Sequence, residues 1–222
     1  SNAYLVLDAS SSEAQWILFH QGYDALKAKW EGASLSHEMA KSQLAIDDCR
    51  SGNNFADWMV KRANDKIPVH VLGKEALDDK LYTALTQATC VYTESMQPTL
   101  HAMRMIKDAW EQTQLQKAAD LGVSAFKQAM RISVQEKLSN ECEIYALFCY
   151  HCHKHGALDF PFPPIVASGS NATVLHYTNN NHRVSVDDCV LMDAGAQSHY
   201  YASDITRVWP ISGRFSAPQK DV

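Results

Sequence analysis

The sequence is poor in the features that mark several large classes of protein. Among its 222 residues no apolar run approaches the roughly 20 residues needed to cross a bilayer, so nothing predicts a membrane span. Lys and Arg number 20 against 25 Asp and Glu, which gives a formal charge of −5. That balance provides no basic footprint for nucleic acid or for an anionic membrane surface. We therefore expect no nucleic-acid partner and no membrane partner.

Several catalytic signatures are also missing. The chain has no Gly-rich phosphate loop, no G-x-S-x-G turn and no H-E-x-x-H motif. Its six cysteines follow no compact repeat and lie mostly in apolar runs, which favours reduced, buried thiols over a disulfide framework. This usage is typical of a reducing compartment, so we expect a cytoplasmic protein.

What is present is a globular composition, with 46% apolar and 20% charged residues. Up to about residue 97, short β-rich runs alternate with helical periodicity, which predicts a small α/β domain over residues 4–97. The predicted strands are 4–7, 15–20, 67–72 and 90–93, and the predicted helices are 53–62 and 75–86. Pro98 marks a break, and a second domain is expected over 98–222. Ser1-Asn2-Ala3 resembles a cloning remnant and is left out.

The second domain opens with two capping boxes. Asp108 with Glu111, and Asn140 with Glu143, each predict the start of a helix, and Gly156 is suited to end the second one. Prolines at 161, 163 and 164 rule out a helix there. The strands predicted after them are 165–167, 173–177, 184–186, 189–193 and 201–209. Together the two parts predict an α+β fold.

Asp193 and Asp204 are the most informative residues. If the strands that carry them form a hairpin centred near Ser198 and His199, the two carboxylates stand opposite each other. Facing anions repel, and one or two divalent cations would convert that repulsion into coordination. A slipped register or a bulge that turns one Asp outward remains the competing interpretation of the spacing.

Two groups of histidines are weaker candidates. In the tract from Cys149 to His155, helical spacing spreads the His and Cys side chains around more than half of a helix. They therefore cannot converge on one ion, and ordinary histidines at a packed helix end are the better interpretation. His176, in the predicted strand 173–177, is by itself more typical of a structural histidine than of a catalytic one.

Taken together, the segments GSNATVLHYTNNN, CVLMDAG and YYASDITRVWPISGRF resemble the aminopeptidase P/prolidase family of metallopeptidases. The resemblance runs from roughly Glu111 to the end. It rests on His176, on the spacing of Asp193 and Asp204, and on the Thr206-Arg207 pair that follows. The earlier α/β region is similar in layout to the creatinase-like N-terminal domain of that family, without its first segment.

The resemblance implies a pita-bread catalytic domain that holds two divalent ions, usually Mn²⁺, with Zn²⁺ and Co²⁺ as alternatives. Asp193 would bind one ion and Asp204 would bridge both. His176 would be the active-site imidazole that hydrogen-bonds the substrate. The implied substrate is a peptide with proline at its second position, and the implied assembly is a homo-oligomer.

The chain departs from the family pattern because one His and two Glu ligands are expected after the second Asp. No Glu follows Glu143 and no His follows His199. We therefore expect a piece of a longer Xaa-Pro aminopeptidase that contains only the first part of the catalytic domain, is inactive by itself, and binds metal weakly. The alternatives are an Xaa-Pro dipeptidase, a methionine aminopeptidase and a non-enzymatic pita-bread scaffold.

Overall fold

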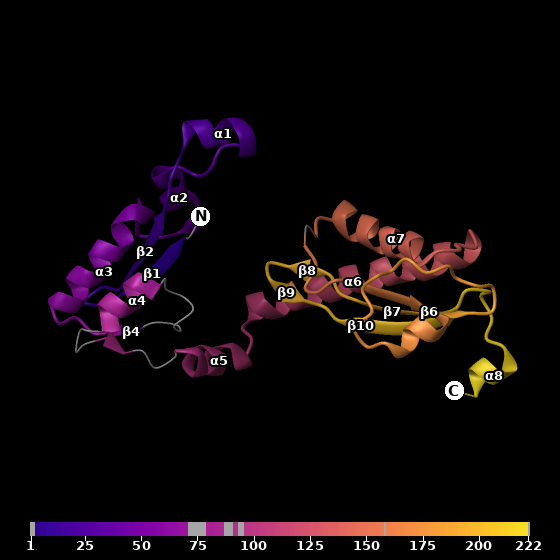
Figure 1. Ribbon diagram of the computed structural model, residues 1–222. Helices are drawn as coiled ribbons and strands as arrows, with labels where there is room; N and C mark the ends of the chain where they lie inside the picture. The colour runs from indigo at the N-terminus through magenta and orange to yellow at the C-terminus, as the bar shows by residue number, and fades with distance from the viewer. Residues whose placement is uncertain (1–2, 71–78, 87–90, 93–95, 158, 222) are drawn as a thin grey trace. The chain divides into compact units, whose positions relative to one another are not determined.

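The structure is a computed structural model of the chain, and it describes residues 3–70, 79–86, 91–92, 96–157 and 159–221 (Figure 1). The chain divides into two compact units, Ser1–Met105 and Ile106–Val222. Helices and strands occur in both units, which confirms the α+β class predicted from the sequence.

The first unit is built on a three-stranded sheet in the order β1-β2-β3. β1 (Tyr4–Asp8) pairs antiparallel with β2 (Gln15–His20), and β2 pairs parallel with β3 (Asp48–Ser51). A short parallel pair joins β4 (Val69–His70) to β5 (Val91–Tyr92). The helical elements are α1 (Ala25–Glu31), α2 (His37–Leu44), η1 (Gly52–Asn54), α3 (Phe55–Asn64), α4 (Asp79–Thr86) and α5 (Gln97–Met105).

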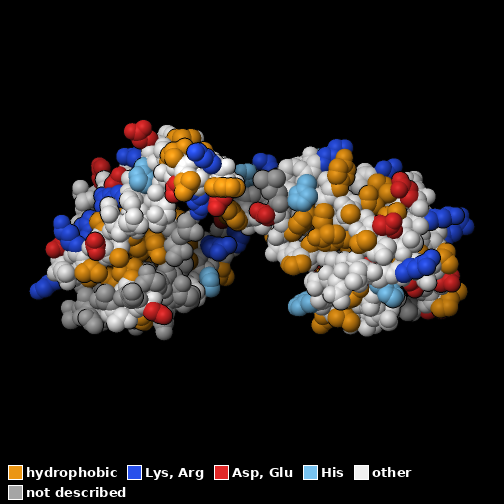
Figure 2. Space-filling view, turned by 45° about the horizontal axis from the view of Figure 1, so that its top comes forward, with side chains coloured by type: hydrophobic (Ala, Val, Ile, Leu, Met, Phe, Trp, Pro, Cys, Tyr) orange, Lys and Arg blue, Asp and Glu red, His pale blue; other side chains and the backbone are white. Residues whose placement is uncertain are grey.

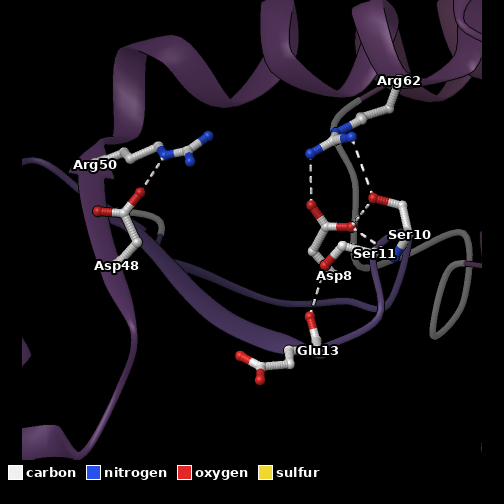
Figure 3. Close-up of polar contacts among 7 residues, drawn as sticks. All are labelled: Asp8, Ser10, Ser11, Glu13, Asp48, Arg50 and Arg62. Carbon is white, nitrogen blue, oxygen red and sulfur yellow. Dashed lines mark hydrogen bonds and ion pairs between the residues drawn. The ribbon is translucent and has the colours of Figure 1, made fainter.

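Alternation along β2 sets the core of this unit. Ile17 and Phe19 are buried, and they pack with apolar residues of α3 and α4: Phe55, Met59, Ala63, Leu81 and Leu85. Polar contacts hold α3 against the sheet (Figure 3). The Arg62 guanidinium of α3 pairs with the Asp8 carboxylate at the end of β1, and it also donates to the Ser10 hydroxyl in the turn that follows.

The second unit packs two helices on one sheet. Its helices are α6 (Ala109–Gln135), α7 (Glu141–Lys154) and the short α8 (Ala217–Lys220). The sheet has the order β10-β7-β6 and is antiparallel, with β6 (Ile165–Ser168), β7 (Cys189–Ala194) and β10 (Ile205–Pro210). Between β7 and β10 lies a small hairpin of β8 (Gln197–Ser198) and β9 (Tyr201–Ala202).

Both predicted capping boxes are present and begin α6 and α7. One face of β7 carries Val190, Met192 and Ala194, all fully buried against these helices. The helices contribute Ala125, Phe126, Ala129, Ile144 and Phe148 to the same core. Figure 1 shows α6 and α7 running alongside the three strands. The opposite face of β7 is therefore free to carry polar side chains.

Exposed large apolar side chains remain in both units, among them Leu5 and Leu7 in the first and Val208 in the second. Figure 2 shows hydrophobic side chains gathered in patches on the visible surface of each unit. No helix in the described part of the chain is both long and apolar enough to cross a membrane.

Several sequence-based expectations are wrong. The predicted strand 173–177 is instead the end of a 3-10 helix, η3 (Gly169–Thr173), followed by a turn. The predicted strand 184–186 does not form, and an isolated bridge between Asn140 and Arg183 lies just before it. The predicted strand 201–209 is divided into β9 and β10. In these segments side chains form hydrogen bonds with the backbone in place of strand pairing. A prediction from β-propensity does not take this competition into account.

Other elements were not anticipated: α1, α2, β3 and α5. Pro98 lies in the first turn of α5, where a missing N–H costs nothing, rather than at a break. Of the remaining predicted elements, 67–72, 75–86 and 90–93 are seen as β4, α4 and β5. Residues 67 and 68 are described but lie outside β4, and 71–72, 75–78, 90 and 93 lie outside the described part of the chain.

Candidate metal centre

Asp193 lies on the open face of the central strand of the second unit. Residues of β7 alternate between the buried helix side and this opposite side, and Asp193 falls on the latter with Leu191. Its cross-strand partners are Ile165 on β6 and Thr206 on β10. Because β7 is paired on both sides, the backbone that carries this carboxylate is held in place.

The hairpin register differs from the predicted one by two residues. His199 and Tyr200 both adopt positive φ, 48° and 67°, in a two-residue turn between β8 and β9. Such turns match the twist of a hairpin. The turn moves the centre by one residue, so Asp193 faces Thr206, and Asp204 is its diagonal neighbour. The predicted direct opposition of the two Asp residues is wrong, but a shift of two keeps both on the same face.

The electrostatics show that the two carboxylates are close. Burial raises the pKa of Asp193, and the Asp204 carboxylate raises it further through its charge and through a side-chain hydrogen bond. A hydrogen bond from Thr206 and the charge of His176 act in the opposite direction without cancelling the increase in this pKa. Asp204 itself is exposed. Two carboxylates, a hydroxyl and an imidazole therefore influence one another at this place.

One oxygen of this group lacks a partner. Oδ1 of Asp193 is buried and forms no hydrogen bond to any described residue. A buried carboxylate oxygen without a donor is costly, because it has lost water and gained nothing. A hard divalent cation would satisfy it, since carboxylate oxygens are the ligands that Mg²⁺, Ca²⁺ and Mn²⁺ prefer. The residues present thus fit such an ion.

His176 is held in a turn by the segment around it. The residue is exposed and follows η3, and its neighbour Tyr177 donates from its hydroxyl to Oε2 of Glu141, 2.8 Å away. Oε2 also accepts from the backbone N–H of His182 at 2.9 Å. Two points of the segment that follows His176, at Tyr177 and His182, are therefore fastened to one carboxylate.

Glu141, which the sequence analysis missed, is the fastening point. It is fully buried, and its Oε1 accepts from the backbone N–H and the hydroxyl of Ser168 at 2.8 and 2.9 Å, with Asn171 at 3.3 Å. Burial by itself raises the pKa of Glu141, but the donors of His182, Tyr177 and Ser168 together leave the pKa below its ordinary value. In the sequence, a Glu in the first turn of a helix suggests only a favourable interaction with the helix dipole, and no neighbouring residue indicates the distant donors that it binds.

The histidine-rich end of α7 forms ordinary contacts, as predicted. His151 lies 3.0 Å from the Ser124 hydroxyl, while His153 and His155 bond to backbone carbonyls of Ala157 and His151 at 2.8 Å. No group of three metal-ligating side chains gathers there among the described residues. The described cysteines, at 49, 142, 149, 152 and 189, are free thiols.

Comparison with known families matches both units. The model described as "Metallopeptidase family M24" covers residues 113–222, and the model described as "Aminopeptidase P, N-terminal domain" covers residues 1–70. Together these two matches include Asp193, Asp204 and His176.

Individual relatives point the same way. The chain is 32% identical over 227 residues to the Xaa-Pro aminopeptidase of Haemophilus influenzae, covering 100% of this chain and 51% of that protein. It is 38% identical over 213 residues to human Xaa-Pro aminopeptidase 3, covering 93% of this chain and 42% of that protein. The chain thus spans about half the length of the curated relatives it matches.

Solved structures agree with the sequence comparisons. The low-pH form of Escherichia coli aminopeptidase P superposes with a TM-score of 0.86 at 26% identity, over 99% of this chain and 52% of that chain. Proline aminopeptidase P II from Yersinia pestis superposes with a TM-score of 0.85 at 29% identity, over 98% of this chain and 52% of that chain.

Proposed function

Because this chain belongs to metallopeptidase family M24 and carries the N-terminal domain of aminopeptidase P before it, we propose that it forms part of a metal-dependent Xaa-Pro aminopeptidase. The proposed reaction is hydrolysis of the bond between the first residue of a peptide and a proline at its second position. The names of the relatives support this substrate, and the chain covers about half of their length.

The observation that carries the proposal is the partnerless Oδ1 of Asp193 beside Asp204. Asp193 and Asp204 would hold the divalent ions, with Asp204 shared between them. When bound, such ions polarise a carbonyl group and lower the pKa of water. The strand that carries Asp193, β7, is paired with β6 on one side and β10 on the other, so this ligand is held in place before a metal binds.

His176 would act on the substrate rather than on the metal. An exposed imidazole on an anchored turn can donate a hydrogen bond to a peptide carbonyl or to the charge that develops on it. Proline has no N–H to offer an enzyme, so recognition must rely on carbonyl groups and ring shape. The Glu141 contacts keep the His176 turn in place for this role.

The test is hydrolysis of an Xaa-Pro peptide by this chain extended through the remainder of the family's catalytic domain. We expect the extended protein to be active, the 222-residue chain to be inactive, and Asp204→Ala in the extended protein to abolish turnover. Asp187→Asn, an exposed carboxylate outside the site, is the matched control. Near-normal turnover of the Asp204→Ala variant would show that the metal assignment is wrong.

We further propose Mn²⁺ as the metal, a cytoplasmic location and a homo-oligomeric assembly. Hard oxygen ligands suit Mn²⁺, and the cysteine usage suits a reducing compartment. β10 is an edge strand among the described residues, with Val208 exposed, and an edge of this kind recruits a second chain. Light scattering at micromolar concentration should show a dimer or larger species, and a stable monomer would contradict the assembly.

A further inference from the structure

A second cluster of metal-ligating side chains lies in the first unit. His20, His37 and Cys49 each present one ligand atom, and these atoms lie within 4.8 Å of one another. This is the only group of its kind found among the described residues. It shares no residue with the Asp193 site, and it is chemically different because it combines two imidazoles with a thiol.

The sheet and one helix bring these residues together from distant parts of the sequence. In the parallel pairing of β2 and β3, Leu18 faces Cys49 and His20 faces Ser51, so His20 and Cys49 share one face of the sheet. The two residues that flank Cys49 on β3, Asp48 and Arg50, bond to each other on the opposite face of the sheet, beneath α3 (Figure 3).

His37 reaches the cluster because it is the first residue of α2. The Ser36 hydroxyl caps this helix by accepting from the backbone N–H of Met39, which fixes where the helix begins. The rings of His20 and His37 meet edge to face, with centroids 4.9 Å apart. Each of the three side chains is therefore placed by regular secondary structure rather than by an irregular loop.

Hydrogen bonding leaves the Nδ1 lone pair of His37 free and Nε2 of His20 without a partner among the described residues. Nε2 of His37 lies 3.3 Å from the backbone carbonyl of His20, which only an N–H can satisfy, so the Nδ1 lone pair of His37 is free. Metal-ligating histidines typically donate their second N–H to a carbonyl in this way. Nε2 of His20 is buried and has no partner among the described residues. Because Nδ1 of His20 accepts from the Gly22 N–H, this Nε2 carries the ring proton in the metal-free chain, and its burial without a partner is the second sign of a missing ligand.

We propose that His20, His37 and Cys49 form a binding site for a thiophilic d¹⁰ cation of the Zn²⁺ type, separate from the hard-cation site at Asp193 and Asp204. Imidazole and thiolate ligands suit Zn²⁺ and disfavour Mn²⁺, whereas the carboxylates of the second unit have the opposite preference. The inference goes beyond the proposed peptidase activity and does not depend on it.

Metal binding requires three small adjustments. Zinc bonds of about 2.0–2.3 Å place ligand atoms roughly 3.3–3.8 Å apart, so ligand atoms within 4.8 Å of one another must close by up to about 1.5 Å. Cys49 must lose its proton, against burial, which raises the pKa of its thiol. His20 must move its ring proton to Nδ1, which now accepts from the Gly22 N–H at 2.9 Å, so that hydrogen bond breaks. Water would fill the fourth position.

The first test needs no variant. The 222-residue chain is alkylated at its thiols with and without one equivalent of Zn²⁺, and the modified cysteines are located by peptide mapping. Zn²⁺ should slow modification of Cys49 at least about tenfold, because a metal-bound thiolate is a poor nucleophile. Cys142, exposed at the start of α7, should react at an unchanged rate and is the internal control. Equal protection of both, or of neither, overturns the site.

The second test assigns the ligands by spectroscopy. Co²⁺ bound to the chain should show a thiolate-to-metal charge-transfer band, which carboxylate ligands cannot produce. Cys49→Ser and His37→Gln should each weaken binding of Co²⁺ and Zn²⁺ by at least about tenfold while the circular dichroism spectrum is retained. Cys149→Ser, in the His-rich end of α7, should leave the band intact. A band that survives Cys49→Ser, or disappears in Cys149→Ser, would refute the assignment.

Discussion

The hydroxyl of Tyr177 donates to Oε2 of Glu141 at 2.8 Å and so ties the turn that carries His176 to the start of α7. The two residues are 36 positions apart in the sequence. Through this contact a carboxylate inside the core controls the position of an exposed imidazole.

Replacing Glu141 with Gln should destabilise the second unit by about 1–3 kcal/mol at neutral pH. The neutral amide accepts fewer and weaker hydrogen bonds from Ser168, Tyr177 and His182, and its NH₂ group has no acceptor in a site that is fully buried. Urea denaturation monitored by circular dichroism measures the change. Glu136→Gln, at the exposed end of α6, is the control and should be neutral.

Glu141 also predicts part of the response to acid. Because the pKa of this carboxyl is lower in the folded chain than in the unfolded one, its contribution is complete above the ordinary Glu value near 4.5. Stability should fall as the pH decreases below that value through the folded pKa. The Glu141→Gln variant should lack this component, and equal acid sensitivity of both proteins would contradict the role of Glu141.

Asp193→Asn should stabilise the metal-free chain at neutral pH by about 1 kcal/mol, since it removes a buried charge beside Asp204. The pKa of Asp193 is raised, so the penalty is absent at low pH and develops as the pH rises through the folded pKa. Thermal melting across this range measures it. A variant as stable as the parent at every pH would argue against the close carboxylate pair.

Mn²⁺ should bind this chain weakly, because Asp193 and Asp204 are the only ligands proposed for it among the described residues. Millimolar Mn²⁺ should nevertheless raise the melting temperature of the unmodified chain and leave that of Asp193→Asn unchanged. Calorimetry that shows sub-micromolar affinity for Mn²⁺ would mean that ligands have been overlooked.

In the extended protein, His176→Ala should lower kcat on the order of 10²-fold while changing KM little, because in its proposed role the hydrogen bond from His176 would strengthen as charge develops on the substrate. Steady-state kinetics on an Xaa-Pro peptide separates the two constants. His155→Ala, an exposed histidine at the end of α7, should behave like the parent. A change confined to KM would instead assign His176 to ground-state binding.

Gly195→Ala should destabilise the second unit by about 3 kcal/mol or more. A Cβ at Gly195 would lie 1.9 Å from the Ser203 carbonyl oxygen and 2.8 Å from Cγ of Pro161, and the backbone cannot yield. Gly32→Ala is the opposite case: its φ of +85° is strained but its Cβ meets nothing, so it measures a purely conformational cost of about 1 kcal/mol, which does not arise at Gly195. Equal losses in the two variants, each measured in urea, would contradict the steric argument.

Local signals in the sequence determined much of this protein. Asp108 and Asn140 begin helices because each side chain bonds to a backbone N–H within its own first turn, which depends only on neighbouring residues. Short apolar, β-rich runs bounded by turn residues likewise identify β2 and β7. Side chains alternate between the two faces of a strand, so a register error of two residues still left Asp193 and Asp204 on the same face.

Contacts between distant segments had to be decided by the tertiary structure. Two positive φ angles, at His199 and Tyr200, set the hairpin register, and neither residue is a typical turn former. Glu141 lies 27 and 41 positions from its partners Ser168 and His182, and His20, His37 and Cys49 meet only after β2, β3 and α2 have packed. The sequence by itself fixes local geometry because short-range hydrogen bonds and side-chain periodicity act within a few residues. Only packing, which pairs groups far apart in the chain, decides which polar atoms end up together.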